Sequence, residues 1–315
     1  MMLLLGLLVV VLIPCSAFAF MAKVTLKVVD EDGKPVNGAN VMICLRGGCL
    51  KKDAIKGKTD NSGLYSVSGL SPDGQVGGEV EKPGYYDSTF HQDFIISKLG
   101  MYQPWNKEMK VLLRPKLNPV PMYVRKKYVK IPFADKKIGF DLIKFDWVAP
   151  YGLGTYEDLI IHVKRSWDGR NNYDSTMTMT FSNKYDGIQT FKLDKGGDFG
   201  VGSEFRLPRY APENGYQNKL VTRKDSNAVD ANAYVTTDTF HFFRIRSEVD
   251  KNGKLKRAMY GKMQGRLRVD PRGGGVGTIE LFYWLNPDYT HNLEFDGDRN
   301  LFSPLPTGES IIRTP

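Results

Sequence analysis

The chain has 315 residues, which is enough for two domains of ordinary size. Its composition, 25% charged and 41% apolar, is that of a folded protein and excludes an intrinsically disordered one. The formal net charge of +9, from 44 basic and 35 acidic residues, favours anionic partners such as acidic glycans, phosphate-bearing polymers or membrane surfaces, without selecting nucleic acid.

The first residues have the pattern of an export signal. An apolar run from Leu3 to Ile13 is followed by small residues at Ala17 and Ala19, which match a cleavage site after Ala19. The run is too short to span a bilayer comfortably. No Lys or Arg precedes it, so an uncleaved N-terminal anchor is the alternative. We expect residues 1–19 to be a signal peptide and the protein to be secreted, periplasmic or on the cell surface.

Two cysteines, Cys44 and Cys49, lie beyond the expected signal. In an exported protein, two nearby cysteines most simply form one disulfide. The intervening Gly47 and Gly48 let the chain turn tightly enough for the two sulfur atoms to meet. We therefore predict a Cys44–Cys49 disulfide, with a redox-active pair as the alternative.

Short runs of alternating apolar and polar residues, separated by turn residues, predict a β-sandwich over residues 22–115. Four pieces carry a more specific signal: DEDGKPVNGANVMI, TDNSGLYSVSGL, VEKPGYY and MKVLLRP. They resemble the carboxypeptidase regulatory-like domain, a transthyretin-type sandwich of seven strands that is close to the Cna-B-like modules of bacterial surface proteins. The resemblance implies a spacer or stability unit that is not catalytic.

A proline-rich linker at residues 116–121 precedes a larger domain at residues 122–315. Strand-like runs recur there and no long helical period appears, so we predict a larger antiparallel β-sandwich. Several pieces, among them SEFRLPRYAPENGYQ and LFYWLNPDYTHNLEFDGDRNLF, are similar to an uncharacterised family of exported bacterial proteins. That resemblance implies export and transfers no activity. Residues 194–232 are rich in Gly and Pro, which predicts a long loop where binding function often lies.

The stretch KLKRAMYGKMQGRLRVD, residues 254–270, carries six basic residues and one acid. Its apolar residues fall mostly at odd positions and its basic residues mostly at even positions, which is the period of a strand. A helix would scatter the charges around its circumference. We therefore predict the middle strand of a three-strand meander, and not an arm that binds nucleic acid.

The hairpin that leads into this strand has two possible registers. A two-residue loop, Asn252-Gly253, would mix the two faces. A three-residue loop, Lys251 to Gly253, pairs Val249 with Leu255 and keeps the faces matched, with Gly in the left-handed position. We predict the three-residue loop, which would also place Glu248 opposite Lys256.

The meander predicts a mixed basic and aromatic sheet face that suits an anionic glycan by ring stacking and bidentate pairing. The residues predicted to form this ligand-binding face are Arg244, Arg246, Tyr260, Lys262, Gln264, Arg266, Arg268, Phe282 and Trp284. The alternative is a solvated face that binds nothing and blocks edge aggregation.

Motifs of catalysis are missing from the sequence: it has no H-E-x-x-H, no G-x-S-x-G and no P-loop. The four histidines are far apart, so we expect structural or surface roles for them. Asp296, Asp298 and Asn300 have the spacing of the first ligands of a calcium loop, but the expected Gly and Glu are absent further on, which favours a solvated turn. Glu294 and Asp296 are a candidate carboxylate pair, but both lie next to apolar residues at what we expect to be an ordinary strand end.

The sequence thus predicts an exported, non-catalytic, all-β protein of the cell envelope. We expect the larger domain to bind an anionic or carbohydrate ligand or an envelope protein, without a cofactor, and with membrane contact only through an uncleaved signal. The alternatives are a glycan-active secreted enzyme, with carboxylates brought together from loops, and a purely structural envelope component. The ligand and the oligomeric state cannot be read from the sequence.

Overall fold

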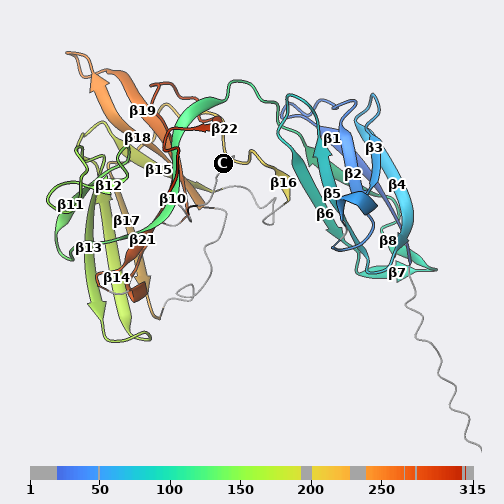
Figure 1. The fold of residues 1–315 in the computed structure, drawn as a ribbon, viewed down its shortest axis with the longest axis horizontal. Helices are drawn as coiled ribbons and strands as arrows, with labels where there is room; N and C mark the ends of the chain where they lie inside the picture. Colours follow the sequence, from blue (N-terminus) through green and yellow to red (C-terminus); the bar gives the residue numbers. More distant parts are fainter. Residues whose placement is uncertain are drawn as a thin grey trace, which may run out of the picture. The chain divides into compact units, whose positions relative to one another are not determined.

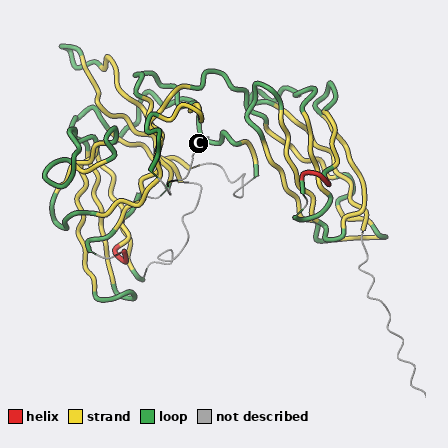
Figure 2. The backbone as a smooth tube through the Cα atoms, viewed as in Figure 1, coloured by secondary structure: helices red, strands yellow, loops and turns green. Residues whose placement is uncertain are grey.

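The computed structural model describes residues 20–48, 50–192, 201–227, 239–265, 267–273, 275–306 and 309. Strands make up nearly all of its regular structure (Figures 1 and 2), which confirms the predicted all-β fold built from sandwiches. Helical structure in these residues is limited to two 3-10 turns, η1 (Lys51–Asp53) and η2 (Pro271–Gly273), so none of them forms a helix able to cross a membrane. The chain divides into two compact units, with the first boundary between Pro115 and Lys116.

The first unit contains two five-stranded sheets. One has the order β4-β1-β8-β7 with β9 also on β1, and its strands are β1 (Phe20–Val29), β4 (Leu64–Ser71), β7 (Ile96–Lys98), β8 (Met101–Gln103) and β9 (Lys107–Leu112). The other has the order β16-β6-β5-β2-β3, and its strands are β2 (Asn40–Cys44), β3 (Ile55–Lys58), β5 (Gln75–Glu81), β6 (Ser88–Asp93) and β16 (Gly202–Ser203).

Seven strands of the first unit have four or more residues. Three shorter strands add to them: β7, β8 and β16. Strand β16 comes from the region predicted to be a long loop, and its two residues pair with Ser88 and Thr89 at the edge of β6. The core is apolar and lies between the sheets, with Val24, Leu26 and Ile43 fully buried.

The second unit contains a seven-stranded and a five-stranded sheet. The larger has the order β15-β18-β19-β21-β10-β22 with β20 also on β21, and its strands are β10 (Val120–Lys130), β15 (Gly187–Lys192), β18 (Thr239–Val249), β19 (Leu255–Gln264), β20 (Val269–Asp270), β21 (Thr278–Asn286) and β22 (Phe295–Asn300). The smaller has the order β12-β11-β13-β14-β17, and its strands are β11 (Lys137–Asp141), β12 (Asp146–Trp147), β13 (Leu159–Trp167), β14 (Tyr173–Thr180) and β17 (Lys219–Asp225).

The centre of the seven-stranded sheet is buried on both faces. One face packs on the smaller sheet and forms the main core, which includes Phe243, Met263 and Tyr283. The other face carries two smaller apolar clusters, in which Trp284 packs with Leu207 and Phe295, and Tyr260 with Ala211 and Leu293. The partners in those smaller clusters come largely from irregular segments, residues 204–217 and 291–294, so this face is covered by coil instead of a third sheet.

Strand β19 lies between β18 and β21, as the predicted meander requires. Val249 pairs with Leu255, and the loop between them has Gly253 at φ +79°, which confirms the three-residue register. Further from the loop, the β18–β19 register shifts twice, between Val249 and Glu248 and between Glu248 and Ile245. Glu248 therefore lies opposite Arg257, and the predicted pairing with Lys256 is wrong, because a bulge advances the chain by one residue.

Candidate functional site

The predicted basic and aromatic face exists, but much of it is closed to solvent. Lys262 pairs with Phe242 on one side and with Trp284 on the other, so these side chains share a face as expected. However, Lys262 is 0% exposed, Trp284 1% and Tyr260 2%. The prediction of a flat, open ligand-binding face is therefore wrong at its centre, because coil segments that the alternation of the strands cannot reveal lie over it.

Lys262 is tied to the segments that cover it. Its Nζ donates hydrogen bonds to the carbonyl oxygens of Leu293 at 2.8 Å and Pro208 at 3.4 Å, and lies 4.9 Å from the centre of the Phe205 ring. Arg244 acts in the same way at the edge of the face, since its guanidinium donates to the Tyr185 carbonyl at 2.6 and 2.9 Å. These cations hold loops in place.

The other residues of the predicted face differ in their surroundings. Phe282 is half-buried and its ring contacts that of Trp284 in a tilted arrangement, with ring centres 4.2 Å apart. Gln264 and Arg268 are also half-buried. Arg266 lies outside the described residues.

Arg246 leaves the predicted face altogether. It sits in the bulge of β18 with φ +51°, and its side chain turns to the main-core side. There it donates to Asp158 at 2.8 and 3.0 Å and to Asp141 at 3.2 Å. Asp186 holds the bulge by accepting the backbone N–H groups of Arg246 and Ser247, both at 2.9 Å.

Burial raises the pKa of Asp158 and of Asp186, although hydrogen bonds from Arg246 and Ser247 respectively oppose the rise. Burial also acts to raise the pKa of Asp141, but backbone N–H donors, together with Arg246, lower it. Since each of these carboxylates already accepts several hydrogen bonds, the cluster is a structural device that fixes the bulge.

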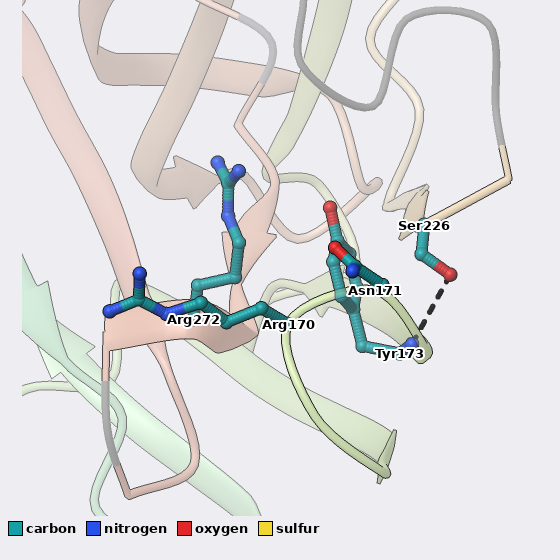
Figure 3. A pocket seen from close by; sticks show the side chains of 5 residues that line it. All are labelled: Arg170, Asn171, Tyr173, Ser226 and Arg272. Atoms are coloured by element: carbon teal, nitrogen blue, oxygen red, sulfur yellow. Dashed lines mark hydrogen bonds between the residues drawn. The ribbon is translucent and has the colours of Figure 1, made fainter.

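A polar pocket of about 630 Å³ lies at one end of the second unit's smaller sheet. Figure 3 shows the five described residues that line it: Arg170, Asn171, Tyr173, Ser226 and Arg272. The two arginines lie along one side, and Asn171, Tyr173 and Ser226 lie opposite them. None of these residues was among the predicted site residues.

Three chain segments bring the pocket together. Arg170 and Asn171 are at the tip of the β13–β14 hairpin, where the N–H of Asp168 donates to the Asn172 carbonyl at 2.8 Å and Gly169 takes φ +95°. Ser226 follows β17 and exchanges hydrogen bonds with the backbone of Tyr173. Arg272 lies in η2, directly after β20.

Arg272 is held in the pocket wall by an acid. Its guanidinium meets the carboxylate of Asp270 at 2.8 and 3.0 Å, and Lys224 reaches the same carboxylate at 2.5 Å. Burial alone would raise the pKa of Asp270, but these two cations lower it below its usual range. Asp270 therefore stays ionised and keeps Arg272 fixed, so the positive side of the pocket is preorganised.

An aromatic pair adjoins the pocket. The rings of Trp167 and Tyr173 stack with centres 5.9 Å apart, and Trp167 is 39% exposed. The guanidinium of Arg165 lies 5.2 Å from the Trp167 ring and donates to the carbonyl oxygens of Pro271, in η2, and Gly275, shortly after it. Stacked rings beside guanidinium groups are a surface on which a sugar ring and its acidic substituent both find partners.

Sequence reasoning missed this pocket because its residues come from three places in the chain, at 170–173, 226 and 272. The dipeptide Asp168-Gly169, which is typical of tight turns, predicts a hairpin tip at this point. That signal places Arg170 and Asn171 on a loop, but nothing in the sequence brings Ser226 or Arg272 beside them.

The weak calcium candidate is not a loop. Asp296, Asp298 and Asn300 belong to strand β22, so the expected solvated turn is wrong here. Asn300 binds the backbone N–H and carbonyl of Val124, and Asp296 pairs with Arg299 at 2.6 Å.

Glu294 does not form a catalytic pair with Asp296. It is fully buried and accepts hydrogen bonds from the backbone N–H groups of Leu117 and Asn118 at 3.0 and 2.9 Å, and it also meets Arg209. Glu294 therefore fixes the start of the second unit.

In the described residues of the first unit, the carboxylates of Glu79, Glu81 and Asp87 come within 4.8 Å of one another. All three side chains are half-buried. Cys49 lies outside the described residues, so the Cys44–Cys49 disulfide stays a prediction.

Comparisons with known proteins add little to this picture. Neither a protein-family model nor a curated protein matches the chain. Among solved structures, the chain is similar to a DUF3823 family protein from Parabacteroides merdae, with 11% identity over 77% of this chain and 96% of the other and a TM-score of 0.24. It is also similar to the shaft pilin SpaA from Lactobacillus rhamnosus, with 12% identity over 83% and 93% and a TM-score of 0.24.

A third similar structure is 3-chlorocatechol 1,2-dioxygenase from Rhodococcus opacus, with 13% identity and a TM-score of 0.24. The match covers 31% of this chain and 61% of the dioxygenase, so this chain spans about three fifths of that protein. These likenesses are too distant to assign a function, and the pocket has to be interpreted from its own chemistry.

Proposed function

We propose that the protein is an exported binding protein of the cell envelope, and that the pocket of the second unit takes an anionic glycan. The observation that carries the proposal is the approach of Arg170 and Arg272 to one cavity of about 630 Å³. Guanidinium groups form paired hydrogen bonds with carboxylate, sulfate or phosphate. Export is supported by the apolar run from Leu3 to Ile13 and the small residues that follow it.

The rest of the lining suits a sugar. Asn171 and Ser226 offer an amide and a hydroxyl to sugar hydroxyl groups, and the exposed ring of Trp167 adjoins the pocket through Tyr173. A hydrolase of glycans would need two carboxyl groups about 5 to 10 Å apart across the ligand. The five described lining residues include no carboxylate, so they favour binding over hydrolysis.

In this proposal the first unit is a spacer. Its sequence resembles the carboxypeptidase regulatory-like domain, and its two sheets enclose an apolar core of their own. The ligand is therefore bound by the second unit alone.

The test is glycan-array binding followed by titration calorimetry on the best acidic oligosaccharide. Arg170 is exposed, so Arg170→Gln is expected to fold normally and to weaken binding about tenfold or more, since hydrogen bonds to charged groups contribute about 1.5 to 3 kcal/mol. Arg223→Gln is the matched control, because Arg223 lies on the nearby strand β17, is exposed, and pairs with Asp174 outside the lining.

We expect neutral oligosaccharides to bind more weakly and binding to fall with added salt. If the wild-type protein binds no acidic glycan, or if Arg170→Gln binds as tightly as Arg223→Gln, the proposal is wrong.

A further inference from the structure

Apolar side chains gather at one end of the first unit. Leu99 is 96% exposed, Ile95 94%, Leu70 63% and Ile96 60%. Single exposed apolar residues are ordinary on a protein surface, but a group of them marks an interaction site. Figure 1 shows β7 and β8, which carry or flank three of these residues, together at the same end of the unit.

The sheet arranges part of this group in a row. Leu70 on β4 pairs with Met21 on β1, Met21 pairs with Met101 on β8, and Met101 pairs with Lys98 on β7. Residues paired in this way share one face of a sheet. Four adjacent strands thus present Leu70, Met21, Met101 and Lys98 side by side.

The row faces away from the core. Ala22, next to Met21, is 0% exposed, and Tyr102, next to Met101, is buried against Phe20 with ring centres 5.5 Å apart. Because side chains alternate along a strand, Met21 and Met101 point to the outer face. Ile96 pairs with Gln103, one step further on the same outer face.

The β7–β8 turn holds Leu99 at the end of the row. Leu99 and Gly100 take φ +51° and +74°, and the Gly100 carbonyl accepts the N–H of Met21 at 2.9 Å. Met21 directly follows Phe20, where β1 begins. The chain therefore enters the first unit at this apolar end, and Leu99 lies beside the point of entry.

The chain that leads to Phe20 indicates what covers the patch. It contains the apolar run from Leu3 to Ile13, which is the most apolar stretch of the sequence and too short to span a bilayer comfortably. In the form that keeps residues 1–19, a lipid surface that receives this run meets the patch at the same place. The basic residues Lys98 and Lys23 lie on the same outer face. This face also carries an acid, Glu108 on β9, which pairs with Thr25, the next outward residue of β1 after Lys23.

We propose that this end of the first unit lies on an anionic lipid surface. Leu99, Ile95 and their neighbours insert between the headgroups, and Lys98 and Lys23 meet the lipid phosphates. Apolar tips with a basic rim are the chemistry of proteins that bind at a membrane interface. This contact adds to any anchoring by the segment before Phe20 and does not depend on the pocket of the second unit.

The test is cosedimentation with vesicles of phosphatidylcholine mixed with phosphatidylglycerol, using the full chain and the form that begins at Phe20. We expect both forms to bind, the full chain more tightly. The double variant Ile95→Ser, Leu99→Asn is expected to lower the partition coefficient of the shorter form about tenfold or more. Asn suits the positive φ of residue 99, so the turn is kept.

The control is Leu153→Ser, because Leu153 is 83% exposed and belongs to the second unit. It is expected to leave binding unchanged.

Lys98→Gln is expected to weaken binding to the mixed vesicles and not to vesicles of phosphatidylcholine alone. Equal binding by the double variant and the wild type would overturn the proposal. A dimer on size-exclusion chromatography that the double variant abolishes, without vesicle binding by the wild type, would assign the patch to a second copy and also overturn it.

Discussion

At the centre of the seven-stranded sheet both faces are buried, but they are built differently. Against the smaller sheet it presents apolar side chains such as Phe243 and Met263. Under the coil segments it presents Lys262, Arg244 and Asn286 among its aromatic residues. A sheet satisfies its own backbone groups, whereas coil leaves carbonyl oxygens that need donors from outside.

The donors on the covered face match that need. Lys262 donates to the carbonyl of Leu293, and the Asn286 side chain donates to the carbonyl of Asn292 at 2.8 Å. A basic strand face therefore has a third interpretation besides a ligand surface and a solvated face. It supplies hydrogen bonds to irregular chain that packs on it.

The sharpest test of this difference is Arg246, which the bulge moves from one face to the other. We expect Arg246→Met to destabilise the second unit by about 3 to 5 kcal/mol, because it leaves the buried carboxylates of Asp158 and Asp141 without their cation. Urea unfolding measures the loss. Arg257→Met is the control, since Arg257 pairs with Glu248 in the same hairpin but in solvent, and little change is expected. Equal effects of the two variants would contradict a structural role for the Arg246 cluster.

On the main-core side, His241 makes the stability depend on pH. Its Nε2 donates to the Gly265 carbonyl at 2.9 Å, and in the neutral ring its Nδ1 accepts from the Thr190 hydroxyl at 2.9 Å. Burial lowers the pKa of His241 to about 4. The folded pKa is below the unfolded value of about 6.5, so this contribution is complete above pH 6.5 and is lost as the pH falls towards 4.

The expected loss from His241 is about 3 kcal/mol between those two pH values. Urea unfolding across this range is compared for the wild type and His241→Gln. His241→Gln is expected to flatten the profile. A profile that His241→Gln does not alter would rule out this residue as the source.

On the covered face, we expect Lys262→Met to destabilise the second unit by about 1 to 3 kcal/mol, because the carbonyls of Leu293 and Pro208 lose their donor. Met263→Leu is the matched control on the opposite face of the same strand, and a swap of similar volume there is expected to cost less than about 1.5 kcal/mol. Thermal unfolding compares the two variants. If Lys262→Met is as stable as the wild type, the donor interpretation of this face fails.

Much of this sheet follows from the sequence. The alternation in residues 254–270 predicts strand β19 and its two faces, and Asn252-Gly253 predicts the loop before it. Alternation is a local property, so it cannot show that residues 204–217 lie over one face. Nor does it reveal the bulge at Arg246, which depends on acids at positions 141, 158 and 186. The pocket is hidden for the same reason, since Arg170 and Arg272 meet only in the folded chain.

Strand β16 limits where the chain can be truncated to obtain the first unit alone. Its two residues complete an edge of the first unit's second sheet. In chain order, however, they come after four of the five strands of the second unit's smaller sheet, β11 to β14. A fragment ending at Pro115 would leave part of the β6 edge bare, and an unpaired edge is where foreign strands attach. The first unit is therefore not a module that recombination or cloning can move as one continuous stretch of gene.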